Sequence, residues 1–213
     1  MSIPRFQLYL FDIDGTLLDS AHDICTAVRQ TLEDAGATGL DDSYLRSFIG
    51  YHLCDLFSEV FPGISEERSA ELLSTYRATY LQRGHASTRV YEGVPEMLSS
   101  LDGLKSTATT KGSETTRNVL TQFGLVSHFD HVQGTDGFPS KPEPDVILRS
   151  LDKFGVAPEN CLFIGDTVPD IEAGRRAGVK TCGVTWGYGD VEAMRAQEPD
   201  YWISSPLELA AAE

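Results

Sequence analysis

Near its start, the 213-residue chain reads Leu8-Tyr9-Leu10-Phe11-Asp12-Ile13-Asp14-Gly15-Thr16. The residues before Asp12 are all apolar, as expected for a strand that is buried on both faces of a parallel sheet. Two acids and a glycine follow, and glycine allows the backbone to turn sharply at that point. The stretch therefore predicts a strand that ends in a turn carrying two carboxylates.

Further along the chain, short apolar runs alternate with helical patterns. The runs cover residues 104–109, 161–164 and 179–184, and the helical patterns cover residues 95–101, 114–123, 142–154 and 171–177. This alternation predicts the α/β fold class, with a doubly wound, Rossmann-like parallel sheet. Ligands of such sheets bind beyond the carboxyl ends of the strands, where Asp12, Thr109 and Asp166 would all lie.

One long insertion interrupts the alternation with helical patterns alone, at residues 20–35, 42–48, 53–61 and 66–82. We expect residues 1–16 and 88–213 to form the catalytic core, and residues 17–87 to form a small all-helical cap domain after the first strand. An insertion at this place would lie over the carboxyl end of that strand as a lid.

The composition limits the classes of partner. The chain has 17 Lys and Arg against 32 Asp and Glu, and its net charge of -15 repels nucleic acid and anionic membrane surfaces. No apolar run is long enough to span a membrane, and the four cysteines form no Cys-x-x-Cys pair. We expect a cytoplasmic monomer or homodimer that binds a small molecule, and neither nucleic acid nor membrane.

Asp12 and Asp14 can face one pocket, because side chains two residues apart on an extended chain point the same way. A carboxylate nucleophile divides phosphoryl transfer into two easier steps, and a second carboxyl can protonate the leaving oxygen and then activate water. Asp12 and Asp14 suit these two roles. An isolated Asp-x-Asp pair is equally consistent with a turn cap.

A second acidic turn follows the apolar run at 161–164, in the stretch Gly165-Asp166-Thr167-Val168-Pro169-Asp170. Asp166 is expected at the same sheet edge as Asp12 and Asp14. Three carboxylates around a phosphate dianion would repel one another strongly, so we predict a bound divalent cation. The available ligands are hard oxygens, which favour Mg²⁺, whereas zinc favours His or Cys.

Two further positions supply donors for a phosphate. Lys141 lies just before a proline-rich helical start, which fixes its backbone while its side chain reaches inward. Thr109, with Thr110 beside it, ends a predicted strand with hydroxyl and amide donors suited to phosphoryl oxygens. Alone, Lys141 also fits a solvated loop lysine and Thr109 a helix cap. Their place between the acidic motifs favours the phosphate role.

An ordered set of motifs thus runs through nearly the whole chain: Asp12-x-Asp14-Gly15-Thr16, then Thr109, then Lys141, then Gly165-Asp166 through Asp170. This set resembles the four signature motifs of the haloacid dehalogenase superfamily. The resemblance implies Asp12 as the nucleophile and Asp14 as the general acid and base. It also implies Thr109, Thr110 and Lys141 as the residues that bind the phosphate.

The same resemblance implies a Mg²⁺ site. Its ligands would be Asp12, the backbone carbonyl of Asp14, and Asp166, with Asp170 as the acid behind them. The chain departs from the family pattern at Thr110, where relatives usually have Asn. Threonine can donate a hydrogen bond but has no amide, so the departure concerns fine positioning rather than the nucleophile or the metal.

The stretches Leu17-Leu18-Asp19-Ser20 and Thr185-Trp186-Gly187-Tyr188-Gly189 look similar to phosphoglycolate-phosphatase-like members of the superfamily. Dehalogenases lack a counterpart of Asp14, so the second aspartate indicates phosphate chemistry. We expect hydrolysis of a small phosphorylated metabolite, either phosphoglycolate-like or a sugar phosphate. In the insertion, candidates for binding the substrate's carboxylate or second phosphate are Arg46, His52 and Arg83, although helix arginines are more often solvated.

Two alternatives stay open. A phosphoryl mutase of the β-phosphoglucomutase type would use the same aspartates and metal, and would differ in whether water reaches the phosphoenzyme. A non-catalytic binding protein could also keep this fold, because a fold alone does not establish activity. Every charged residue type that catalysis requires is present, which favours an enzyme.

Overall fold

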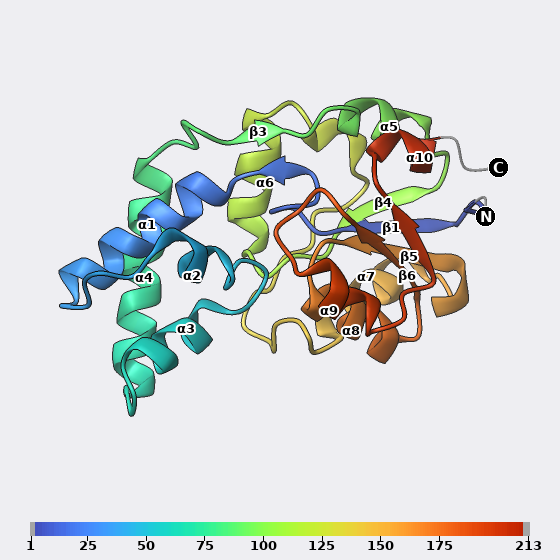
Figure 1. Cartoon of the computed structure of the whole chain (residues 1–213). Coiled ribbons are helices and arrows are strands. Elements are labelled where there is room, and N and C mark those ends of the chain that lie inside the picture. Colours follow the sequence, from blue (N-terminus) through green and yellow to red (C-terminus); the bar gives the residue numbers. More distant parts are fainter. Residues whose placement is uncertain (1–2, 211–213) are drawn as a thin grey trace. The chain divides into compact units, whose positions relative to one another are not determined.

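The structure is a computed structural model that describes residues 3–210 and contains two compact units. Residues up to 19 and from 89 onward form the first, here called the sheet unit, and residues 20–88 form the second, the helical unit. Figure 1 labels the elements of both units. That the helical unit acts as a cap over the site stays a prediction.

Five parallel strands form the main sheet of the sheet unit, in the order β4-β1-β5-β6-β7. They are β1 (Leu8–Phe11), β4 (Leu104–Thr107), β5 (Cys161–Gly165), β6 (Lys180–Val184) and β7 (Tyr201–Ile203). In this register Leu10 lies beside Ser106 of β4 and Phe163 of β5. The predicted α/β class and parallel sheet are confirmed.

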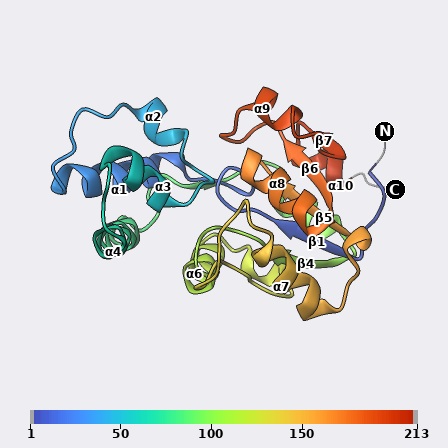
Figure 2. The same ribbon diagram turned by 90° about the horizontal axis from the view of Figure 1, so that it is seen from below.

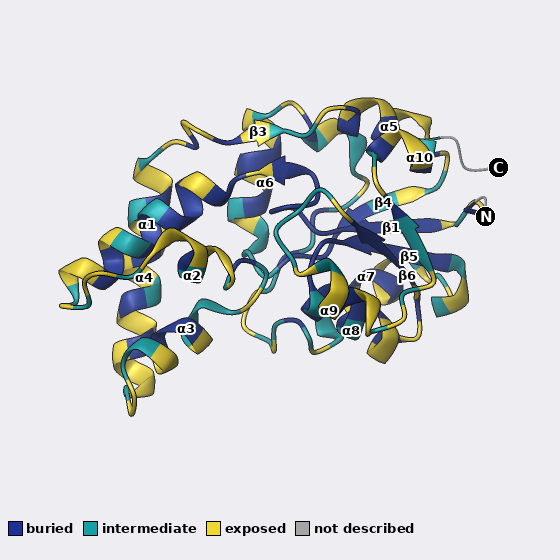
Figure 3. Ribbon diagram, viewed as in Figure 1, coloured by how far each residue is buried: buried dark blue, intermediate teal, exposed yellow. Residues whose placement is uncertain are grey.

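Successive side chains of β1 point to opposite faces of the sheet, and the helices form one layer on each face. Tyr9 and Phe11 pack in one core with α5, α6 and α10, and Leu8 and Leu10 pack in a second core with α7 and α8. In Figure 1, α5 and α10 lie above the sheet and α7 and α8 below it, and Figure 2 views them from below. Figure 3 shows β1 buried between the layers.

The helices of the sheet unit are α5 (Val94–Ser100), α6 (Ser113–Gln122), α7 (Asp145–Phe154), α8 (Val168–Ala177), α9 (Val191–Arg195) and α10 (Pro206–Ala210).

Two of these helices begin away from their predicted first residues, for local reasons. α7 begins at Asp145 rather than at residue 142, because two prolines disfavour helical backbone at the residues before them. α8 begins at Val168 rather than at residue 171, because Thr167 and Asp170 form a capping box at its start. The short strand β7 and an antiparallel ribbon of β2 (Leu18–Asp19) and β3 (Arg89–Val90) were not predicted, since so few residues carry little pattern.

The parallel arrangement brings the carboxyl ends of three strands together. The amide of Asp12 donates to the carbonyl of Ile164 at 2.9 Å, and the amide of Ala108 donates to the carbonyl of Phe11 at 2.8 Å. The residues that follow β1, β4 and β5 are therefore held side by side at one edge of the sheet. This edge carries the candidate site.

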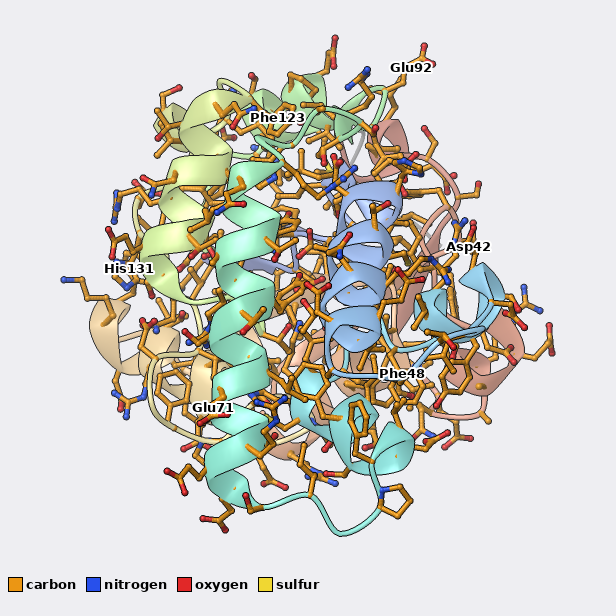
Figure 4. All side chains as sticks on the ribbon, turned by 90° about the vertical axis from the view of Figure 1, so that its left-hand side faces the viewer. Asp42, Phe48, Glu71, Glu92, Phe123 and His131 are labelled. Atoms are coloured by element: carbon orange, nitrogen blue, oxygen red, sulfur yellow. The ribbon has the colours of Figure 1, made fainter. Side chains whose placement is uncertain are left out.

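The helical unit consists of α1 (Ala21–Asp34), α2 (Asp42–Arg46), α3 (Leu53–Val60) and α4 (Glu66–Gln82). Figure 4 shows α1 and α4 side by side, and these two helices make the main contact within the unit. The side chains of Asp41, His52 and Ser65 accept backbone amides at the starts of α2, α3 and α4. Within residues 3–210, no helix is both long and apolar enough to cross a membrane.

A buried aspartate joins the two ends of the helical unit. Asp23, on the first turn of α1, accepts hydrogen bonds from the Ser87 amide and the Thr88 hydroxyl, both at 2.9 Å, and from Arg83 at 3.2 Å. Burial would raise the pKa of Asp23, but these hydrogen bonds and the charge of Arg83 outweigh it and hold the pKa below its usual value. Asp23 is therefore an ionised link between α1 and the segment that leaves the unit.

Replacing Asp23 with alanine should lower the free energy of unfolding by about 3 kcal/mol, because it leaves buried donors without an acceptor. Urea unfolding would measure the loss. Glu33→Ala, at an exposed position of the same helix, should change the value by less than about 0.5 kcal/mol. Equal effects of the two substitutions would contradict the structural role of Asp23.

Candidate active site

A buried lysine lies at the centre of the candidate site. The Nζ atom of Lys141 is 2.7 Å from Oδ1 of Asp12 and 2.5 Å from Oδ1 of Asp170. The same atom lies over the ring of Phe163, 5.4 Å from its centroid. Because the Lys141 side chain is 0% exposed, its charge is balanced by protein groups and not by water. It is therefore not a solvated loop lysine.

The second acid that contacts this lysine belongs to a helix cap. Oδ2 of Asp170 accepts the Thr167 amide at 2.9 Å and the Thr167 hydroxyl at 2.6 Å. Both oxygens of Asp170 are thus engaged, one by the start of α8 and the other by Lys141. This arrangement fixes the position of the ammonium relative to β1 and α8.

Burial and charge act in opposite directions on these groups. Burial raises the pKa of Asp12 to about 6; Lys141 counteracts it, and the charges of Asp170 and Asp14 add to it. For Lys141, burial would lower the pKa, but Asp12 and Asp170 outweigh it and hold the pKa above its usual value. The pKa of Asp166 lies well above its usual value because of burial and of neighbouring Asp170 and Asp12. One lysine therefore does not neutralise the carboxylates around it.

Asp166 occupies a tightly enclosed position after β5. Its Oδ1 accepts the Thr16 hydroxyl at 2.9 Å, and its Oδ2 accepts the backbone amide of Tyr188 at 2.8 Å. A Cβ atom added at Gly15 would lie 2.1 Å from Oδ2 of Asp166, and one added at Gly187 would lie 2.3 Å from the same atom. Gly15 also has a φ of +90°, which a side chain would disfavour. Glycine is needed at both positions to admit this carboxylate.

The donor atoms at this edge fit a hard divalent cation. One carboxylate oxygen each from Asp12, Asp166 and Asp170 lie within 4.8 Å of one another, and all three residues are buried. Asp170 already has both oxygens engaged, whereas, among residues 3–210, Oδ2 of Asp12 accepts no hydrogen bond. Oxygen ligands of this kind suit Mg²⁺. The triad can hold a metal ion.

The second aspartate of the first motif pairs with a different lysine. The Nζ atom of Lys111 lies 3.0 Å from Oδ2 of Asp14, and each side chain is 11% exposed. In the same loop, Oγ1 of Thr109 accepts the Lys111 amide at 3.3 Å, which leaves the hydroxyl proton of Thr109 able to donate. Thr110, between them, is half-buried.

The structure brings the predicted residues of the sheet unit to one edge. The three candidates of the insertion lie in the helical unit. Arg83 pairs with Asp23, and its side chain is 28% exposed. Nδ1 of His52 accepts the Cys54 amide at the start of α3, and burial lowers the pKa of His52. Arg46 lies exposed at the end of α2. Their contact with substrate stays a prediction.

Sequence reasoning missed three contributions to this site. Lys111 was given no role, although a lysine directly after Thr109-Thr110 at a strand end is a visible signal. The Thr16 hydroxyl was quoted within its motif but not linked to Asp166. The Tyr188 contact uses a backbone amide, which every residue except proline carries, so the residue type gives no signal for it.

Solved structures and curated proteins are similar to this chain. A crystal structure described as a predicted phosphatase from Clostridium acetobutylicum superposes with a TM-score of 0.89 at 29% identity, over 97% of both chains. The phosphoglycolate phosphatase of Aquifex aeolicus is 34% identical over 207 residues, which cover 95% of this chain and 94% of that protein. A 5'-nucleotidase of Pseudomonas aeruginosa is 33% identical over 204 residues, or 94% of this chain and 92% of that protein.

These similarities define the class of protein as a phosphatase built on a parallel sheet with helices. Residues 9–184 match the family described as haloacid dehalogenase-like hydrolase. The chain belongs to this family, and the resemblance inferred from its four motifs is confirmed.

The carboxylate cluster predicts how a metal ion affects folding. Mg²⁺ at about 100 times its dissociation constant should raise the melting temperature of the chelator-treated protein by roughly 5–10 °C, because it binds only the folded state. Asp166→Asn should abolish this shift. The variant without metal should be at least as stable as the wild type, since a buried charge is removed while Asn can accept from Tyr188 and donate to Thr16.

Thermal unfolding with and without Mg²⁺ would measure these effects. Asp152→Asn is the matched control, because it removes an exposed carboxylate of α7. The control should keep the full shift. A full shift in Asp166→Asn as well would place the metal elsewhere.

Proposed function

We propose that this chain is a Mg²⁺-dependent phosphatase that hydrolyses a small phosphate monoester through an aspartyl phosphate on Asp12. The observation that carries the proposal is the state of the Asp12 carboxylate. Its Oδ1 is held at 2.7 Å by a buried ammonium, and its Oδ2, among the described residues, accepts no hydrogen bond. One oxygen is therefore fixed while the other is available to attack phosphorus.

In the first step, Oδ2 of Asp12 attacks the phosphorus atom and the bond from phosphorus to the ester oxygen breaks. Asp14 donates a proton to that oxygen, so that the product leaves as an alcohol. In the second step, Asp14 takes a proton from water, which attacks the phosphorus of the aspartyl phosphate and releases inorganic phosphate. Asp12 is then regenerated as a carboxylate, and the two steps leave the enzyme unchanged.

Other groups of the sheet edge would bind the transferring phosphoryl group. Lys141 carries a fixed positive charge beside Asp12, and the hydroxyls of Thr109 and Thr110 can donate to the equatorial oxygens. Mg²⁺, bound by Asp12, the Asp14 carbonyl and Asp166, would supply the positive charge that offsets the remaining carboxylates and the phosphate. Asp170 would act through Lys141, whose position it fixes.

The relatives support hydrolysis as the outcome. Curated proteins at 33–34% identity carry the names phosphoglycolate phosphatase and 5'-nucleotidase, which favours a phosphatase over a mutase or a non-catalytic protein. We propose a small phosphorylated metabolite as substrate, either phosphoglycolate-like or a sugar phosphate. The helical unit would cover the site as a cap, with Arg46, His52 and Arg83 as its candidates for substrate contact.

The activity can be tested by phosphate release from a panel of 2-phosphoglycolate, sugar phosphates and a nucleoside 5'-monophosphate. Release is expected with Mg²⁺ and should be lost with excess chelator, because the carboxylates are then not offset. Restored release after Mg²⁺ is added back would separate metal loss from unfolding. A folded, Mg²⁺-supplied protein that releases phosphate from no compound would contradict the proposal.

Asp12→Asn should reduce turnover of the best substrate by at least about a thousandfold, because the amide is not a nucleophile. Its circular dichroism should match that of the wild type, since the two side chains have nearly the same volume. Asp152→Asn, a charge-matched control on α7, should retain activity. A turnover within tenfold of the wild type in Asp12→Asn would exclude the covalent mechanism.

A further inference from the structure

The ion pair between Lys111 and Asp14 places a second cation in the site. Lys141 is 0% exposed and committed to two carboxylates, whereas the Lys111 side chain is 11% exposed and lies 3.0 Å from the proposed general acid. An ammonium has three donors, so Lys111 can hold Asp14 and still bind another acceptor. Of the two lysines, Lys111 is therefore the one that a substrate can reach.

The loop that carries Lys111 is held in place by residues 135–136, which lie further along the chain. Thr135 donates its amide to the Lys111 carbonyl at 3.0 Å and its hydroxyl to the Thr109 carbonyl at 2.9 Å. One step further, Asp136 accepts the Ser113 amide at 3.0 Å. The backbone of Lys111 is therefore fixed on both sides, which limits where its ammonium can lie. A fixed cation can discriminate between ligands, whereas a mobile one attracts any anion.

The contact with Asp14 relates Lys111 to the leaving group of the substrate. The ester oxygen must lie within hydrogen-bond distance of Asp14, because Asp14 is its proposed proton donor. A carboxylate on the carbon next to that oxygen would approach the acidic edge of a protein of net charge -15. Without a local cation, Asp14 would repel it. Lys111 is the cation in contact with Asp14.

We propose that Lys111 is a specificity-determining residue, which selects phosphate monoesters whose leaving alcohol carries a carboxylate next to the ester carbon. Its ammonium, 3.0 Å from the carboxyl group of Asp14, would bind the carboxylate of the substrate. The inference rests on the proposed phosphatase function and adds the residue that recognises the leaving group. It also assigns a use to the third residue of Thr109-Thr110-Lys111.

The test compares two substrates of the same size. 2-Phosphoglycolate carries the carboxylate, and 2-hydroxyethyl phosphate carries a neutral hydroxymethyl group in its place. Lys111→Gln should lower kcat/KM for 2-phosphoglycolate by about 10–100-fold, mainly through KM, as expected for loss of a charged hydrogen bond. The value for 2-hydroxyethyl phosphate should fall by a smaller factor, so that the ratio of the two kcat/KM values drops by about tenfold or more.

Two control variants separate charge from position. Lys111→Arg should restore most of the preference for 2-phosphoglycolate, because it keeps a cation in the same loop. Lys153→Gln, which removes an exposed lysine of α7, should leave both substrates unaffected. Equal losses for both substrates in Lys111→Gln would show that the lysine acts only through Asp14. Unchanged values would exclude any role, and either result would overturn the proposal.

A binding measurement separates this inference from the proposed chemistry. In the Asp12→Asn protein with Mg²⁺, calorimetry should show tighter binding of 2-phosphoglycolate than of 2-hydroxyethyl phosphate, and the added Lys111→Gln substitution should remove the difference. If the wild type releases phosphate from no compound of the panel, the proposed activity fails while this binding preference still tests Lys111. Equal affinities with and without the lysine would contradict the specificity role.

Discussion

Lys141 carries a positive charge into the sheet unit at a place where its side chain is 0% exposed, and two carboxylates stabilise it there. Removing the lysine would leave Asp12 and Asp170 as buried charges without a cation, which is a strongly destabilising change. Because Asp12 follows β1 and Asp170 caps α8, the lysine connects three separate parts of the chain. The geometry of the site therefore depends on this buried ion pair.

The parallel sheet determines which charges meet. Strand order β4-β1-β5 places the ends of three strands in contact, so that Thr109, Asp12 and Asp166 share one edge although they are far apart in sequence. That edge collects more carboxylates than lysines. Burial first, and then the charges of neighbouring carboxylates, raise the pKa of Asp12 and Asp166. A divalent cation would offset these charges and those of a bound phosphate. This surplus of buried carboxylates is the feature that the proposed metal ion would offset.

The sequence predicted the parts of this structure that leave a local signal. The apolar run of β1 gave its bounds, and acids after two strands indicated the carboxylate cluster. The pairing of Lys111 with Asp14 was not predicted, because it depends on how two loops approach each other. The position of the Asp166 carboxylate depends on a backbone amide and on space left by glycines such as Gly187. Neither feature has a sequence pattern that predicts it. Contact of the helical unit with substrate stays a prediction, because it depends on packing between separate units that no local pattern encodes.

The most direct test of this account is to trap the phosphorylated enzyme during turnover with Mg²⁺. Borohydride reduces an acyl phosphate to an alcohol and would convert a phosphorylated aspartate to homoserine, which peptide mass spectrometry can locate. The account predicts homoserine at Asp12, and none when substrate is omitted. Sustained phosphate release with no modified Asp12, or with the modification at another carboxylate, would contradict it.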